Sequence, residues 1–371
     1  DGAGMMFLYN RHGALQAFLA QAFDQRIPYG DPCPWGVAQV FNSQDPERAE
    51  IARRIVERAC DDFNLTMLGW RDVPCCEDIL GDMARETLPH LQQVLIENPD
   101  RGRPTARRSH PDRFAIILYR VRRQIDQEVK RAGINEFHVC SMSPFTVVYK
   151  GMFRASQIGE FYQADLGHPD FQVAAVMYHQ RYATNTPWFW SNAQPFSMLG
   201  HNGEINTLSG NRNWTRARLA GLRGRRARIF ADLLTNGSDS YQLNNVLEAV
   251  IHCGVDPVSA LLGLIPEAWE SRLGMADGLV EGPESQCSKV LPHLLGDELE
   301  ERDDELRPAR EALAQRGVLG GDTDRAGVQM ADPHHAAARH DQRRGREAEP
   351  VGAEHRRDHH VAAGLELAVH L

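Results

Sequence analysis

Polar side chains that can bind charged groups gather between His179 and Asp239. They form three stretches: His179-Gln180-Arg181-Tyr182-Ala183-Thr184-Asn185-Thr186, His201-Asn202-Gly203-Glu204-Ile205-Asn206 and Asn236-Gly237-Ser238-Asp239-Ser240. An arginine can hold a carboxylate at two points, and an Asn-Gly turn can offer a side-chain amide and a backbone N–H to an oxyanion. Structural interpretations also exist: a surface cation at Arg181, a type I′ turn at Asn202-Gly203 and a helix N-cap around Ser238. The residue types alone leave both interpretations open.

The sequence lacks the motifs of several other enzyme classes. No GxxxxGK, GxGxxG, HExxH or GxSxG pattern occurs, so phosphate-loop, dinucleotide-binding, zinc-protease and lipase-type functions have no motif support. The histidines near the C-terminus have no spacing that suits a tetrahedral metal site; they are His334, His335, His340, His355, His359 and His360. We therefore expect no metal centre.

Composition predicts the cellular compartment of the protein and excludes some classes of partner. The 371 residues carry a formal net charge of −9, which gives nucleic acid no general attraction, and the arginines at 101–108 and 223–228 are expected to be solvated. No apolar run approaches the ~18 residues of a membrane span, and no secretory signal is present, so we expect a cytoplasmic protein without a membrane partner. Seven cysteines without a CxxC pair indicate reduced thiols.

Hydrophobic periodicity predicts an α+β fold, with strands clustered centrally and helices before and after them. Strands are predicted at 5–9, near 69–74, at 137–153 as a hairpin around Ser141–Pro144, at 171–182, and at 196–208 as a pair joined by Asn202-Gly203. Helices are predicted at 45–63, 76–87, 212–222, 244–252 and 257–264. The stretch 114–131 is interpreted as β-rich at first and helical toward its end.

The sequence changes character after Trp269. No aromatic residue follows it, and residues 271–371 are rich in Ala, Gly, Arg, Glu and His. The composition predicts one domain at 1–270 and a separate tail at 271–371 that is either disordered or the product of a frameshift. The chain also opens at Asp1 inside a glycine turn, without an initiator Met, so we expect residues to be missing upstream.

Eight ordered sequence blocks between Asp1 and Trp269 resemble the class II glutamine amidotransferase domain of the glutamate synthase family. The blocks are DGAG at 1–4, GWRDVP at 69–74, VVYKGM at 147–152, HQRYATNT at 179–186, AQPF at 193–196, HNGEINTL at 201–208, NGSDS at 236–240 and IPEAW at 265–269. Simpler members of the amidotransferase class lack GWRDVP and IPEAW, so the resemblance points to glutamate synthase in particular.

The resemblance implies a fold and a reaction. The fold is the four-layer αββα sandwich of N-terminal-nucleophile hydrolases, here incomplete at its N-terminus. The reaction is release of ammonia from L-glutamine, which the parent enzyme adds to 2-oxoglutarate to make L-glutamate. The expected partners are L-glutamine, the synthase domains of the parent chain and a reductase small subunit. FMN and an iron–sulfur cluster are expected in other parts of the parent enzyme, and no cofactor is expected in this chain.

The matching motifs also imply roles for individual residues. Arg181 would bind the substrate carboxylate and Asp239 the substrate ammonium. Asn202 and Gly203 would form the oxyanion hole, and the same Asn-Gly turn can satisfy both its structural and its catalytic interpretation. The pocket would also be lined by Tyr182, Thr184 and Gly237.

The nucleophile that the resemblance implies is absent from this sequence. The family uses a cysteine at the mature N-terminus, whose free α-amino group acts as the base. All seven cysteines here are internal, and Cys140, in a strand-like stretch, is interpreted as a core thiol. Three hypotheses remain: a truncated glutaminase domain that is inactive alone, a glutamine-binding domain that does not hydrolyse its ligand, and a non-functional truncated product.

Overall fold

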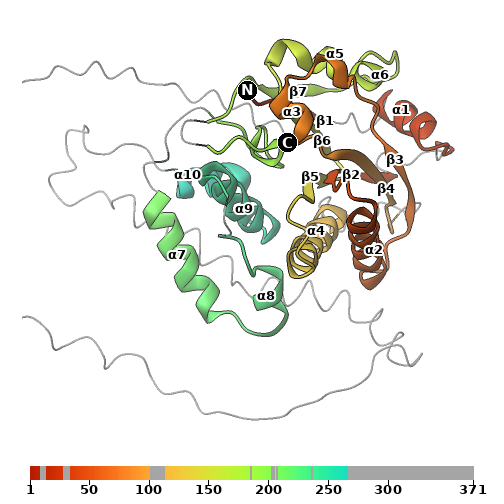
Figure 1. The fold of residues 1–371 in the computed structure, drawn as a ribbon. Helices are drawn as coiled ribbons and strands as arrows, with labels where there is room; N and C mark the ends of the chain where they lie inside the picture. The colour runs from red at the N-terminus through yellow and green to blue at the C-terminus, as the bar shows by residue number, and fades with distance from the viewer. Residues whose placement is uncertain are drawn as a thin grey trace, which may run out of the picture. The chain divides into compact units, whose positions relative to one another are not determined.

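The computed structural model describes residues 1–8, 14–27, 34–100, 113–183, 186–201, 205, 208–234 and 237–265 (Figure 1). The strands are β1 (Ala3–Leu8), β2 (Trp35–Asn42), β3 (Met67–Asp72), β4 (His90–Glu97), β5 (His138–Ser143), β6 (Thr146–Gly151) and β7 (Ala175–His179). The helices are α1 (Ala14–Ala22), α2 (Pro46–Asp62), α3 (Asp82–Glu86), α4 (Arg113–Arg131), α5 (Ile158–Phe161), α6 (Gln163–Leu166), α7 (Leu208–Gly221), α8 (Gly224–Ile229), α9 (Asp239–His252) and α10 (Pro257–Leu264). Short 3₁₀ turns lie at Glu77–Ile79, Ala155–Gln157 and Trp190–Asn192.

The strands form two antiparallel sheets, in the orders β6-β1-β7 and β3-β4-β2-β5. The predicted hairpin across 137–153 is therefore wrong, because β5 pairs with β2 while β6 pairs with β1. The Ser143 side chain accepts hydrogen bonds from the backbone N–H groups of Phe145 and Thr146, at 3.0 and 3.2 Å, and so stabilises the turn that carries the chain from one sheet to the other. Two adjacent β-rich runs predict two strands but not their partners.

Helices α2 and α4 pack together on one face of the four-stranded sheet. Helix α2 begins where its sequence predicts, because the Asp45 carboxylate accepts from the N–H groups of Glu47 and Arg48 and Pro46 occupies the first turn. Its apolar stripe, which includes Ile55, contacts the alternate apolar residues of β2 and β4. Helix α4 is helical from its first residue, so the prediction of a β-rich start was wrong. The run at 114–118 is apolar because it is buried on several sides, a pattern that periodicity cannot separate from a strand.

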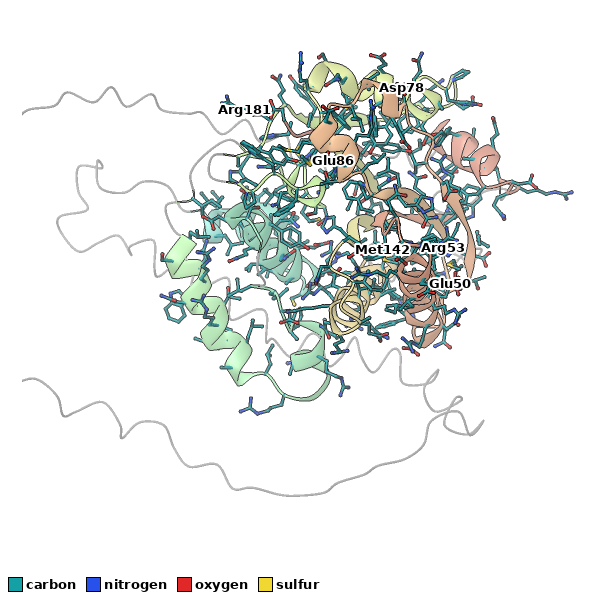
Figure 2. The ribbon with its side chains drawn as sticks, viewed as in Figure 1. Glu50, Arg53, Asp78, Glu86, Met142 and Arg181 are labelled. Atoms are coloured by element: carbon teal, nitrogen blue, oxygen red, sulfur yellow. The ribbon has the colours of Figure 1, made fainter. Side chains whose placement is uncertain are left out.

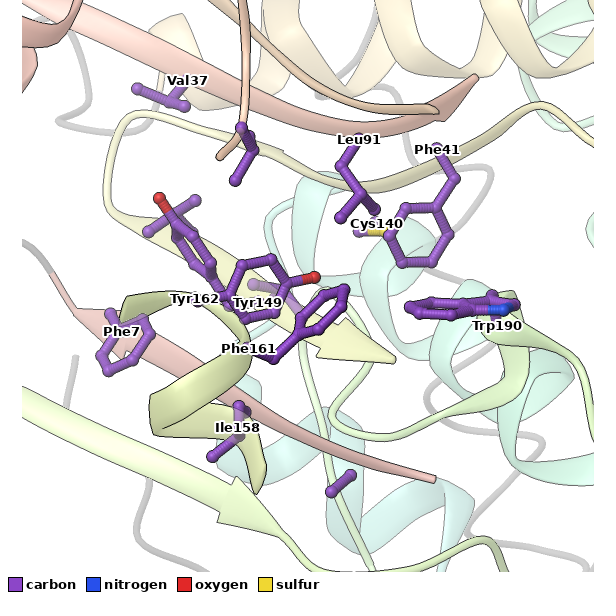
Figure 3. Close-up of a cluster of buried hydrophobic side chains, with 14 of the residues drawn as sticks. Phe7, Val37, Phe41, Leu91, Cys140, Tyr149, Ile158, Phe161, Tyr162 and Trp190 are labelled. Atoms are coloured by element: carbon purple, nitrogen blue, oxygen red, sulfur yellow. The ribbon is translucent and has the colours of Figure 1, made fainter. Parts of the chain in front are cut away.

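The other face of the four-stranded sheet packs against the three-stranded sheet. Their shared core, part of which Figure 3 shows, is rich in aromatic rings that meet edge to face, with Phe7 5.8 Å and Tyr162 5.0 Å from Tyr149 between ring centroids. Cys140 lies inside this cluster, as predicted for a core thiol. A further apolar cluster joins α9 and α10 to Phe196 and Leu199.

The described residues confirm the α+β class. The predicted helices at 212–222, 244–252 and 257–264 correspond to α7, α9 and α10. The predicted helix at 76–87 is split into a 3₁₀ turn and the short α3. Of the strand pair predicted at 196–208, residues 196–201 form no strand, while the Asn202-Gly203 turn lies outside the described residues, as does the tail from 271 onward. None of the helices in the described part of the chain is long and apolar enough to cross a membrane.

Candidate active site

Four of the motif blocks meet through hydrogen bonds made by His201. The backbone oxygen of His201 lies 3.0 Å from Nε2 of His179, and its ring Nε2 lies 2.7 Å from the hydroxyl of Ser240. The side-chain oxygen of Gln194 accepts from the backbone N–H of His201 at 2.9 Å. Arg181, Asn202 and Asp239 each lie within two residues of one of these bonded residues. The fold therefore gathers stretches that are far apart in the sequence.

Gln194 and His179 are buried polar residues whose hydrogen bonding is incomplete. Gln194 is 1% exposed and His179 is 7% exposed. Among the described residues, Nε2 of Gln194 and Nδ1 of His179 have no hydrogen-bond partner, and an unpaired buried polar atom costs free energy. Each side chain also makes one hydrogen bond to the backbone of His201, which an apolar residue of similar size would lose.

The segment that carries Gln194 is fixed to the three-stranded sheet by Lys150 and Gly4. The Lys150 ammonium donates to the backbone oxygen of Ser191 at 2.7 Å and lies 5.0 Å from the ring centre of Phe196. A Cβ on Gly4 would lie 2.6 Å from the backbone oxygen of Gln194, so only glycine permits this approach. Burial lowers the pKa of Lys150 to about 8.

Arg181 and Tyr182 follow β7 at the edge of the three-stranded sheet. The Arg181 side chain is exposed and points outward in Figure 2, and no carboxylate partner is found for it in the described part of the chain. Tyr182 donates from its hydroxyl to the backbone oxygen of Phe189 at 2.9 Å. Its ring covers Gly2, where an added Cβ would lie 2.4 Å from the ring. Together with the close approach of Gln194 to Gly4, this contact explains why positions 2 and 4 of the DGAG block are glycines.

Asp239 belongs to the first turn of α9. The N-cap is Ser238, whose hydroxyl accepts from the backbone N–H of Tyr241 at 3.2 Å. The Asp239 carboxylate instead forms an ion pair with Arg212 of α7, at 2.7 Å. Gly237, just before the cap, is exposed. The capping interpretation of this stretch is therefore right for Ser238 and leaves the Asp239 side chain available for another role.

Several predicted site residues lie outside the described residues: Asn202, Gly203 and Thr184. Arg212, Gln194 and Lys150 were not singled out from the sequence. Gln194 and Lys150 stand inside the AQPF and VVYKGM blocks, which were the only signal for them. Arg212 stands in no block, because its contact with Asp239 depends on how α7 and α9 pack.

Three of the described cysteines, Cys60, Cys75 and Cys140, are poor nucleophiles. Burial raises the pKa of Cys140 to about 12, and burial together with neighbouring acids raises those of Cys60 and Cys75 to about 12 and 11. A thiol with a raised pKa is protonated near neutral pH. Cys33 and Cys287 lie outside the described residues. Among the described residues, no group of three or more acidic, histidine or cysteine side chains is arranged to hold a metal ion.

Comparison with known proteins identifies the family. The family model "Glutamine amidotransferases class-II" matches residues 1–281, which extends past the domain boundary predicted at 270. Ferredoxin-dependent glutamate synthase 2 of Synechocystis is 38% identical over 284 residues, 75% of this chain and 17% of that protein. The chloroplastic ferredoxin-dependent glutamate synthase of rice is 38% identical over 245 residues, 64% of this chain and 15% of that protein.

A further relative is similar to this chain at nearly the same identity. The glutamate synthase [NADPH] large chain of Azospirillum brasilense is 37% identical over 241 residues, 63% of this chain and 15% of that protein. The chain thus spans less than a fifth of the length of these relatives. With a family match over residues 1–281 and the ordered motifs above, this chain belongs to the class II glutamine amidotransferases.

Proposed function

We propose that this chain binds L-glutamine as the glutaminase part of a glutamate synthase, in which the released ammonia would be used to make L-glutamate. The observation that carries the proposal is the set of hydrogen bonds at His201, which joins the stretches of Arg181, Asn202 and Asp239. The relatives' names support the class of the whole enzyme.

The charges suit the two ends of free glutamine. Arg181 binds the α-carboxylate, for which its planar guanidinium offers two parallel donors. Asp239 binds the α-ammonium. Tyr182, Thr184 and Gly237 line the pocket between them. Asn202 and Gly203 donate to the oxygen that becomes an oxyanion when a nucleophile attacks the side-chain amide, and ammonia leaves as that oxyanion collapses.

We propose that the 371-residue chain binds glutamine without hydrolysing it. The backbone nitrogen of every cysteine is part of an amide bond, so none offers the free α-amine that acts as the base in this family. A glutamine-binding domain is therefore the second candidate function. We also propose the αββα arrangement, of which α2 with α4 and the two sheets supply three layers.

The proposal is tested by calorimetry and by an ammonia assay on the purified chain. We expect saturable binding of L-glutamine and no ammonia above background. Arg181→Lys keeps the positive charge but cannot form two parallel hydrogen bonds to the α-carboxylate, so glutamine affinity should fall by about tenfold or more. The matched control is Arg54→Lys, an exposed arginine on α2, which should bind like the parent. Absence of glutamine binding by the parent chain would overturn the proposal, and ammonia release that is lost in Cys140→Ser would show that the nucleophile is internal.

A further inference from the structure

Arg212 connects α7 to the first turn of α9 through two hydrogen bonds. Its Nε donates to the side-chain oxygen of Gln242 at 2.7 Å, and its Nη2 donates to Oδ1 of Asp239 at 2.7 Å. Gln242 is 9% exposed, so the acceptor that anchors the guanidinium is itself held in place. The Asp239 side chain, in contrast, is 61% exposed. One rigid, planar group thus joins a fixed residue to an exposed carboxylate.

This arrangement leaves one oxygen of the Asp239 carboxylate for another cation. Oδ1 is turned toward α7, and within the described residues no partner is found for Oδ2. Asp239 is not the cap of α9, because Ser238 performs that role. An isolated ion pair at this exposure would contribute little to stability. The contact is therefore better explained as one that fixes the orientation of the Asp239 carboxylate.

Arg212 also couples Asp239 to α7. Helix α7 begins at Leu208, directly after the HNGEINT residues that include Asn202 and Gly203. The helix is also anchored by Asn211, a buried residue whose amide donates to the backbone oxygen of Leu264 at 2.8 Å. In glutamine, the α-ammonium and the side-chain amide are separated by a fixed number of bonds. A pocket selective for it needs a fixed spacing between the groups that bind its two ends.

We propose that Arg212 is a positioning residue that orients the Asp239 carboxylate toward the α-ammonium of the ligand, and so makes binding selective for an amino acid over the same molecule without its amine. This inference rests on the proposed function. Arg212 acts through geometry, since its positive charge by itself opposes an ammonium nearby. A lysine keeps that charge, but its single ammonium cannot reproduce the fork that reaches Gln242 and Asp239 together.

The test compares two ligands by calorimetry on the full chain: L-glutamine and 4-carbamoylbutanoate, which is glutamine without its α-amino group. For Arg212→Lys we expect glutamine affinity to fall about three- to tenfold, because the carboxylate must now be ordered during binding, while affinity for 4-carbamoylbutanoate is unchanged. Asp239→Asn should show the same selectivity with a larger loss. Adding Arg212→Lys to Asp239→Asn should have no further effect on glutamine binding.

Arg216→Lys is the matched control on the same helix, because Arg216 is exposed and bonds only to Asn213 in the described structure. It should bind both ligands like the parent, and thermal unfolding should show that every variant is folded. If Arg212→Lys fails to fold, Gln242→Glu takes its place, because a charged acceptor would draw the guanidinium away from Asp239 and should produce the same selective loss. Equal loss for both ligands, or no loss for glutamine, would overturn the role of Arg212. A parent chain that binds 4-carbamoylbutanoate and glutamine equally would also overturn it, whereas a parent that binds neither would overturn the proposed function itself.

Discussion

At the scale of single residues, Lys150 is an ammonium enclosed by the protein. It is 1% exposed, and its contacts are the Ser191 carbonyl and the face of Phe196. Burial lowers its pKa from 10.5 to about 8, while the nearby Cys140 thiol acts in the opposite direction. The folded protein therefore releases this proton at a lower pH than the unfolded chain does. Lys150 thus links the pH of the solution to the stability of the segment that carries Gln194.

We expect the contribution of Lys150 to stability to become more favourable as the pH rises from 8 toward 10.5. In that window the unfolded chain binds the proton and the folded chain does not, so raising the pH favours the folded state by up to about 1.4 kcal/mol per pH unit. Below pH 8 both states are protonated and the contribution is constant. The measurement is the free energy of unfolding in urea at pH 7.5, 8.5 and 9.5 for the parent and for Lys150→Met, which lacks the group.

The difference between the two proteins isolates this lysine, because other titrating side chains are common to both. A difference that stays constant from pH 7.5 to 9.5 would contradict the lowered pKa. Lys150→Arg is the matched control, since arginine stays protonated over this range and should behave as Lys150→Met does in its pH dependence.

At the scale of elements, a buried polar network fixes the two sheets to each other. Arg71 of β3 forms an ion pair with Asp165 of α6 and donates from Nε to the side chain of Gln93 at 2.8 Å. Tyr149 of β6 donates to Asp165 at 2.8 Å, and Gln93 donates to the Tyr149 oxygen at 2.8 Å. Burial by itself would lower the pKa of Arg71, but Tyr149 and Asp165 raise it above its ordinary value. The arginine of the GWRDVP block is therefore charged and structural.

We expect Arg71→Met to reduce the free energy of unfolding by about 3–5 kcal/mol, because it leaves the Asp165 carboxylate buried without its cation. Asp165→Leu should have a similar effect through the unpaired guanidinium. The double variant should be no less stable than the worse single variant, since neither charge remains. Urea unfolding of the four proteins measures this cycle. Strictly additive losses of stability would show that Arg71 and Asp165 do not interact.

The sequence predicted elements well where a local signal defines their ends. Helix α10 agrees at both ends because Asp256 caps it, accepting from the N–H of Ser259, and Pro257 follows. Strand partners could not be predicted in the same way: β5 and β6 are neighbours in sequence, yet each bonds to a strand more than ninety positions distant. The contact between Arg212 and Asp239 has the same origin. The motif predicted a ligand-binding role for Asp239, but its ion pair with Arg212 depends on tertiary packing, which the motif does not contain.

At the scale of the whole molecule, neither the family match nor the aromatic residues reach the C-terminal part of the chain. The match ends at residue 281, and aromatic residues end at Trp269. We expect a chain that ends at residue 281 to keep the thermal midpoint of the full chain within about 2 °C and to bind glutamine with the same affinity, because the segment removed has no aromatic residue and few β-branched ones. Differential scanning calorimetry and glutamine titration test this. A large drop in the midpoint would mean that residues 282–371 contribute to the folded domain.

The central position of β1 in its sheet has a consequence for the protein during synthesis. Ala3 pairs with Gly151 and Gly4 pairs with His179, so the β-sheet partners of β1 are translated long after it. At a ribosomal rate of about 5–20 residues per second, the interval is on the order of ten seconds. For that time the run Met5-Met6-Phe7-Leu8 has both edges unpaired, which makes it a template for association between nascent chains. A chaperone that binds short apolar segments would find a binding site there.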